Sequence, residues 1–250
     1  MIDLHMLTLQ QKNILVTGAS AGIGKQIAIT AASIGATVTL VGRNLERLQQ
    51  TKAAMAGDGH KVLALDLTNE KSFALIIANS RPFDGVVFNA GVVEYTPVKF
   101  LNSEKIYKIF STNVTSNMLL CQQLLKNKLL AKKGSLVFIS SISSKLGVPG
   151  TSLYAASKAA LSAFAKVLAS EVAPQGIRSN SVCPGIVLTA MTDQAMEVTS
   201  TEDMAKGALL YPLGYGEPQD VAGMVMYLLS DISKWVTGTD IILDGGLTLK

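Results

Sequence analysis

The chain alternates short apolar runs with longer segments of helical periodicity. Several apolar runs, such as ILV after Asn13 and VVF after Gly85, carry hydrophobic residues without interruption. Strands with one solvated face alternate apolar and polar residues, whereas an uninterrupted apolar run is typical of a parallel strand covered on both faces. The runs that we predict as strands are residues 13–18, 37–42, 61–67, 84–90, 134–141, 177–185 and 239–246.

Helical patterns fill the intervals between these strands. They span residues 24–35, 44–57 and 103–130, an alanine-rich stretch around residues 154–173, and a last segment that begins near Pro218. Such strand–helix alternation predicts an α/β fold with a doubly wound, mostly parallel seven-stranded sheet and helices on both faces. We expect the 250 residues to form a single domain.

One segment is long for a connection in such a fold. Residues 186–213 separate the sixth strand from the last helix, and they include several methionines and leucines. Excursions of this length are usually functional. Two interpretations stay open: a lid that forms a wall of a substrate pocket, or a helix that packs its own apolar stripe.

Composition excludes several classes of protein. Hydrophobic residues make up 48% and charged residues 16%, which excludes a disordered chain. The net charge of +4 is not concentrated in a basic run, so we expect no nucleic-acid partner. No apolar run reaches the ~18 residues of a membrane span, and the first residues lack the pattern of a signal peptide. We therefore expect a cytoplasmic protein without membrane association.

Cysteine and histidine are scarce. Cys121 and Cys183 lie far apart in the sequence and are interpreted as small buried hydrophobes. His5 and His60 have no metal-ligating residues at suitable spacing around them, so we predict no metal site. Any acid–base chemistry is then expected to use another side chain.

A glycine-rich turn follows the first predicted strand. Gly18, Gly22 and Gly24 stand in the sequence TGASAGIG, at the transition from a strand to a helix. Glycines at such a turn let a pyrophosphate approach backbone N–H groups at the positive end of the helix. The spacing differs from G-x-G-x-x-G, and packing alone also selects glycine turns between strands and helices.

The ends of the next two strands indicate which dinucleotide the glycine turn would bind. For a dinucleotide with a free ribose 2′-hydroxyl, we would expect a carboxylate at the end of the second strand, but Gly42 and Arg43 stand there. A guanidinium suits a 2′-phosphate, with Ser20 as a second donor; alternatively, Arg43 is a solvated surface charge. Asp66, after the third strand, either caps the following helix or accepts from an adenine amino group.

The alanine-rich helix carries a tyrosine and a lysine four residues apart, Tyr154 and Lys158. Residues at this spacing share one helix face. One interpretation is a half-buried tyrosine beside a lysine that extends to solvent. The other is an acid–base pair: free tyrosine has a pKa near ~10, and a neighbouring ammonium favours the phenolate and would lower that pKa.

Five motifs in the same order and spacing resemble those of the classical short-chain dehydrogenase/reductase family, over nearly the whole chain. They are TGASAGIG, the NAG triplet at residues 89–91, Asn113, the serine Ser141 with the Tyr154–Lys158 pair, and the PGIVLT segment at residues 184–189. The resemblance implies a Rossmann-like fold and an oxidoreductase that transfers a hydride between a nicotinamide and a carbonyl or secondary alcohol. It decides between the two interpretations of Tyr154 in favour of the acid–base pair.

The resemblance also implies roles for individual residues. Tyr154 would be the acid and base, Lys158 would hold the nicotinamide ribose, Ser141 would donate to the substrate carbonyl and Asn113 would keep a water in the proton relay. NADP(H) is the expected cofactor and NAD the less favoured one; Ala21 supplies no basic residue, so this preference depends on Arg43. The expected cofactor-binding residues are Gly18, Ser20, Ala21, Gly22, Ile23, Gly24, Arg43, Asp66, Leu67, Asn89, Ala90, Gly91, Tyr154, Lys158, Pro184, Gly185, Val187 and Thr189.

The sequence does not select a particular small-molecule substrate. Residues that follow the motif strands are candidates to contact it, namely Glu94, Ser143, Val148 and Met191. One alternative is a 3-oxoacyl-acyl-carrier-protein reductase, for which Lys132 is a carrier-docking candidate while Gln175 replaces the second usual basic residue. Another is a catalytically silent dinucleotide sensor of the same fold. By resemblance, helices near residues 113–129 and 154–173 and the final strand form two kinds of contact in a homotetramer.

Overall fold

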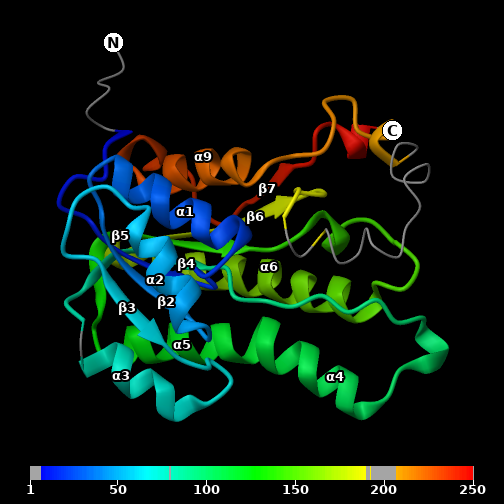
Figure 1. Ribbon diagram of the computed structural model, residues 1–250, viewed down its shortest axis with the longest axis horizontal. Helices are drawn as coiled ribbons and strands as arrows, with labels where there is room; N and C mark the ends of the chain where they lie inside the picture. The colour runs from blue at the N-terminus through cyan, green and yellow to red at the C-terminus, as the bar shows by residue number, and fades with distance from the viewer. Residues whose placement is uncertain (1–6, 79, 190–191, 193–206, 250) are drawn as a thin grey trace.

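The fold is built around a parallel β-sheet (Figure 1). The computed structural model describes residues 7–78, 80–189, 192 and 207–249. Within these residues, seven strands pair in the order β3-β2-β1-β4-β5-β6-β7, and every pair is parallel. The strands are β1 (Asn13–Thr17), β2 (Thr37–Gly42), β3 (Lys61–Ala64), β4 (Phe83–Phe88), β5 (Leu130–Ile139), β6 (Arg178–Pro184) and β7 (Asp240–Leu243). The predicted doubly wound sheet is confirmed.

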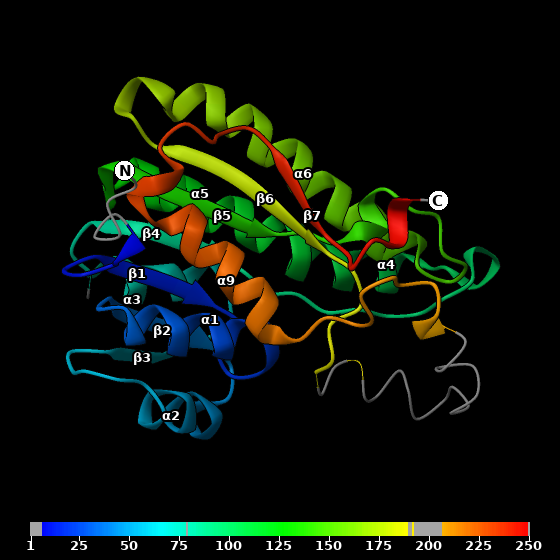
Figure 2. The same cartoon turned by 90° about the horizontal axis from the view of Figure 1, so that it is seen from above.

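Helices cover both faces of the sheet (Figures 1 and 2). One face is covered by α1 (Gly22–Ser33), α2 (Leu45–Ala53) and α9 (Pro218–Leu229), and the other by α3 (Phe73–Ala78), α5 (Ser116–Lys126) and α6 (Ser152–Val172). Successive strand residues face opposite sides: Val137 packs with the first set of helices, and Leu136 and Phe138 pack with the second. Phe138 stacks on Phe88 at 4.4 Å between ring centroids. Uninterrupted apolar runs are therefore required because both faces are buried.

The prediction of one continuous helix over residues 103–130 is wrong. The structure has α4 (Ser103–Phe110), a π-helical turn at Ser111–Thr115, and then α5. The strand β5 already begins at Leu130, four residues before the predicted start, and an irregular register with β4 accommodates the extra length. The sequence does not reveal this turn because residues 103–130 contain neither Pro nor Gly to mark a break in the helix.

The strand β3 is shorter than the predicted segment 61–67. It ends at Ala64, and Asp66 Oδ1 accepts hydrogen bonds from the backbone N–H and the hydroxyl of Thr68 at 2.9 and 2.8 Å. A side-chain acceptor two residues before a donor closes a turn, so the chain leaves the sheet here. This turn brings Asp66 and Leu67 to the carboxyl edge of the sheet, where strand order reverses between β1 and β4.

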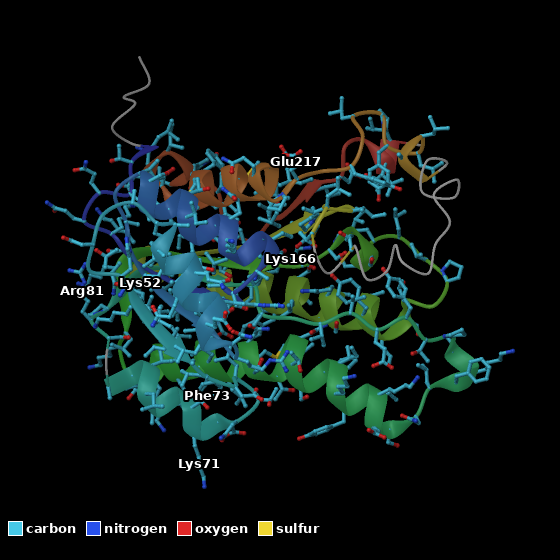
Figure 3. The ribbon with its side chains drawn as sticks, viewed as in Figure 1. Lys52, Lys71, Phe73, Arg81, Lys166 and Glu217 are labelled. Atoms are coloured by element: carbon cyan, nitrogen blue, oxygen red, sulfur yellow. The ribbon has the colours of Figure 1, made fainter. Side chains whose placement is uncertain are left out.

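The surface charge is spread over the molecule. In Figure 3, Arg81 and Lys71 project outward at different edges of the structure, and Lys52 lies on a third element, α2. No helix in the described part of the chain is long and apolar enough to cross a membrane.

Candidate active site

The turn after β1 is fixed by close packing of glycine backbone. Gly18 has φ +65°, and a Cβ there would lie 2.7 Å from Nδ2 of Asn89. A Cβ on Gly24 would overlap the carbonyl oxygen of Gly18 and the same amide. Asn89 Nδ2 donates to the carbonyls of Thr17 and Gly18 at 3.1 and 3.2 Å, so it holds the turn from the end of β4. Both glycines are thus required by geometry.

The first turn of α1 offers backbone donors to the cavity. Its N-cap residue, Ala21, makes no side-chain capping hydrogen bond, and no acidic residue lies in the first helical turn. Ala21, Gly22 and Ile23 all line the cavity at this point. Uncapped N–H groups at the positive end of a 12-residue helix suit a pyrophosphate, so this part of the chain fits a dinucleotide.

The residues expected at the adenosine end lie together. Ser20, Arg43, Asp66 and Leu67 line the same cavity. A Cβ on Gly42 would lie 3.5 Å from Ser20 Oγ, so the glycine turn and the end of β2 are adjacent. The Thr68 hydrogen bonds and, to a smaller extent, the Arg43 charge hold the pKa of Asp66 below its ordinary value. Asp66 closes the turn through Oδ1, but the cap of the following helical turn is Asn69, which accepts from the Lys71 N–H at 3.2 Å. The expected capping role of Asp66 is therefore wrong, and Oδ2 is not used by the turn.

Asn113 lies in the π-helical turn and is fully buried. Its side-chain amide pairs with the backbone of Val92, accepting from the N–H at 2.8 Å and donating to the carbonyl at 2.9 Å. It also donates to Ser157 Oγ at 3.0 Å. A π turn leaves backbone groups outside the regular ladder and is frequent at functional sites. Here it connects the segment after β4 to the helix that carries Tyr154.

Ser141, Tyr154 and Lys158 converge on one side of the cavity. Ser141 follows β5 and interacts with the Tyr154 hydroxyl, while its own Oγ accepts from the Ser143 N–H at 3.1 Å. One turn along α6, Lys158 is buried, and its Nζ donates to the carbonyl of Ile139 at 2.8 Å. The same Nζ lies 5.6 Å from the centroid of the Tyr154 ring. The prediction that Tyr154 and Lys158 share one helix face is confirmed.

The expected lowering of the Tyr154 pKa is wrong for this structure. Burial raises the pKa of Tyr154 to about 12, although the Ser141 hydrogen bond acts in the opposite direction. Burial also lowers the pKa of Lys158 to about 8. Desolvation opposes the charged form of both groups. The consequence is a phenol that stays protonated at neutral pH and is therefore prepared to donate.

The remaining predicted residues are divided by the structure. Ala90, Gly91, Pro184, Gly185, Val187 and Thr189 line the cavity, as do Ser143 and Val148. Glu94 is not among the lining residues, because it forms ion pairs with Lys105 and Lys108 at 3.3 and 3.2 Å. Met191 and much of the segment 186–213 lie outside the described residues.

The cavity, of about 450 Å³, also has walls that the sequence analysis missed. Tyr211 is buried, its ring packs on Tyr215 at 5.0 Å, and its hydroxyl accepts from the Ile186 N–H at 3.3 Å. Tyr211 belongs to the segment 186–213, for which a role as a pocket wall was one of two interpretations, but the sequence does not single out this residue. Further missed lining residues are Val92, Val93, Tyr95, Ile142, Leu146, Thr151 and Leu247. In the described part of the chain, no group of three His, Cys, Asp or Glu side chains is placed to hold a metal ion.

Comparisons with known proteins agree with this geometry. A family model described as "Enoyl-(Acyl carrier protein) reductase" matches residues 18–248. A cyclopentanol dehydrogenase from Comamonas sp. is 36% identical over 244 residues, covering 95% of this chain and 97% of the relative. A 3-oxoacyl-[acyl-carrier-protein] reductase from Rickettsia felis is 34% identical over 245 residues, covering 98% of this chain and all of the relative (100%).

Solved structures give the same result. A short-chain type dehydrogenase/reductase from Mycobacterium marinum superimposes with a TM-score of 0.89 at 32% sequence identity, covering 99% of both chains. The glycine turn on β1, the buried asparagine and the Ser–Tyr–Lys group thus occur in a chain whose relatives share its full length. This protein is a member of the classical short-chain dehydrogenase/reductase family.

Proposed function

We propose that the protein is an NADP(H)-dependent oxidoreductase that interconverts a ketone and a secondary alcohol, with Tyr154 as the acid and base. The observation that carries this proposal is the convergence of Ser141, Tyr154 and Lys158 on one cavity that also contains the uncapped start of α1. The family supports oxidoreductase chemistry, and the names of the relatives include an alcohol dehydrogenase.

We assign the cofactor to the part of the cavity that begins at the glycine turn after β1. The glycine turn and α1 would hold the pyrophosphate, and Ser20 and Arg43 would hold the phosphate on the adenosine ribose. Lys158 and residues 184–189 would hold the nicotinamide end. When bound, the nicotinamide supplies the hydride donor or acceptor. Every other step belongs to side chains of this chain.

In the reducing direction, the side chains stabilise and protonate the carbonyl oxygen. Ser141 donates a hydrogen bond to that oxygen, and Tyr154 transfers its proton to it as negative charge develops. The raised pKa keeps Tyr154 in its donor form. The Lys158 ammonium, held beneath the ring, opposes the cost of the phenolate that remains after transfer. Asn113, whose side-chain amide is held by Val92 and Ser157, is assigned to keep a water in the proton relay.

The test is replacement of Tyr154 by phenylalanine. Because the change removes the proton donor and leaves the ring, we expect kcat to fall ~100- to 10,000-fold while NADPH affinity stays within a few-fold. The measurements are NADPH oxidation with a panel of ketones and NADPH fluorescence titration. Tyr107→Phe is the matched control, since Tyr107 is exposed and outside the cavity. Near-wild-type turnover of Tyr154→Phe would rule out the assignment.

A second candidate is a 3-oxoacyl-acyl-carrier-protein reductase, the name carried by a relative that is matched over its full length. Lys132 lies near the start of β5, at the opposite end of that strand from Ser141. Gln175 stands where the second basic docking residue is expected, so only one of the two is present, and we favour a free ketone or alcohol. The catalytically silent alternative is disfavoured because the acid–base group is complete. Preferential turnover of acetoacetyl thioesters would favour the second candidate.

A further inference from the structure

The charged side chains around the substrate end of the cavity are paired with one another. Glu94 is held by Lys105 and Lys108, as described above. Lys145, in the loop after Ser141, forms an ion pair with Asp240 at 2.6 Å. Among the described residues that line the cavity, the charged ones are Arg43, Asp66 and Lys158. The first two lie at the adenosine end, and Lys158 is buried and donates to Ile139.

The hydroxyl groups of the cavity wall are also largely satisfied within the protein. Ser116, Ser140, Thr151 and Thr192 donate to backbone carbonyls at 2.7, 2.9, 2.7 and 2.7 Å. The Tyr211 oxygen accepts from the Ile186 N–H, and this bond leaves the Tyr211 O–H as a donor. The hydroxyls of Ser141, Ser143 and Tyr154 form the cluster that faces the reacting position, which matches the needs of one carbonyl oxygen.

Among the described residues, most of the other side chains at this end are apolar. They come from the segment after β4, the loop after β5, the segment after β6 and the turn after β7; they are Val93, Ile142, Leu146, Val148, Ile186 and Leu247, together with the aromatic ring of Tyr95, which also carries a hydroxyl. Val148 and Ile186 are partly exposed at 48% and 39%, so they border the opening. An uncompensated carboxylate or several hydroxyls would lose hydration here without gaining partners.

We infer that the substrate class is a neutral, predominantly apolar ketone or secondary alcohol, not a keto acid or a polyhydroxylated sugar. This inference rests on the proposed function and makes it more specific. A pocket that gives hydrogen bonds to one oxygen and dispersion contacts to the remainder discriminates by polarity, because polar groups on the substrate would be left unpaired.

The experiment compares carbonyl compounds with the same carbon skeleton, using NADPH oxidation by the full-length protein. The first pair is 2-pentanone against 4-oxopentanoate, and the second is 2-butanone against erythrulose. We expect kcat/KM to be at least tenfold higher for the neutral, unhydroxylated member of each pair. Equal or better turnover of 4-oxopentanoate or erythrulose overturns the inference but leaves the proposed function standing. NADPH binding without turnover of any ketone overturns the proposed function and the inference with it.

A variant tests the wall directly. Val148→Lys places an ammonium at the opening, so kcat/KM for 4-oxopentanoate relative to 2-pentanone should rise at least tenfold. Val98→Lys is the matched control, because Val98 is an exposed valine that does not line the cavity. An unchanged ratio in Val148→Lys, or an equal rise in Val98→Lys, shows that this wall does not select the substrate by charge.

Discussion

At the scale of single residues, Arg43 and Gly42 are proposed to decide the choice of cofactor. Arg43 is exposed and lines the cavity together with Ser20, and its charge contributes to the lowered pKa of Asp66. Gly42 has room for a side chain, since an added Cβ would meet Leu48 and Ser20 at 3.4 and 3.5 Å, ordinary contact distances. A carboxylate at this position would repel a phosphate and accept from a free 2′-hydroxyl.

We therefore predict that wild-type protein prefers NADPH to NADH by tens- to hundreds-fold. Two charge-assisted hydrogen bonds are worth ~1.5–3 kcal/mol each, solvent exposure reduces the total, and ~1.4 kcal/mol is tenfold in affinity. Arg43→Ala should raise KM for NADPH and barely change KM for NADH, and adding Gly42→Asp should shift the preference towards NADH. Steady-state kinetics with both cofactors measures this, with Arg47→Ala as the control, an arginine outside the cavity. An unchanged ratio in Arg43→Ala would make Arg43 a surface charge.

At the scale of elements, Asp240 connects three parts of the fold at the start of β7. Its carboxylate accepts from Lys145 of the loop after β5, from Lys166 of α6 at 2.8 Å, and from the Ser181 hydroxyl of β6. Burial disfavours its charge, but these three donors outweigh burial and hold the pKa of Asp240 at about 2. The loop that carries Ser141 is thereby attached to the edge of the sheet.

Asp240→Asn should destabilise the protein at pH 7 by about 1–3 kcal/mol, because it replaces a charged acceptor by a neutral one. The pKa is lower in the folded protein than the ordinary value of 3.8. The stabilisation is thus present above about pH 4 and is lost as pH falls towards about 2. Urea unfolding at pH 7 and pH 3 should show a smaller difference from wild type at the lower pH. Asp58→Asn, an exposed turn residue, is the control, and a pH-independent difference would contradict the prediction.

At the scale of the whole molecule, apolar side chains remain exposed on elements near the β7 edge. Trp235 is 96% exposed, Val167 on α6 is 61% exposed and Ile242 on β7 is 44% exposed. In the described residues, β7 pairs with β6 alone, so its other edge is open. Open strand edges and large exposed apolar groups are typical of surfaces that pair with another copy.

We predict a homotetramer, in which one two-fold contact uses this edge and the other uses helices α5 and α6. Light scattering should give about four times the chain mass of 26.4 kDa. Ile242→Lys should reduce the assembly to a dimer, because it places a charge on the open edge. Leu45→Lys, on exposed α2, is the matched control and should leave the tetramer intact. A monomer at micromolar concentration would contradict the prediction.

The sequence by itself determined where strands stand along the chain and that they are covered on both faces, because such a strand needs an apolar run that is visible locally. It also determined where glycines and the Tyr154–Lys158 pair stand, since turn geometry and helix spacing are local properties. Only the tertiary structure decided what depends on contacts between distant segments. In the π turn, the Asn113 side chain is hydrogen-bonded to the backbone of Val92, which is 21 residues earlier in the sequence. Glu94 does not line the cavity, and its carboxylate is paired with two lysines of α4. The direction of the Tyr154 pKa shift also depends on the assembled fold, because burial raises the pKa by more than the Ser141 hydrogen bond lowers it.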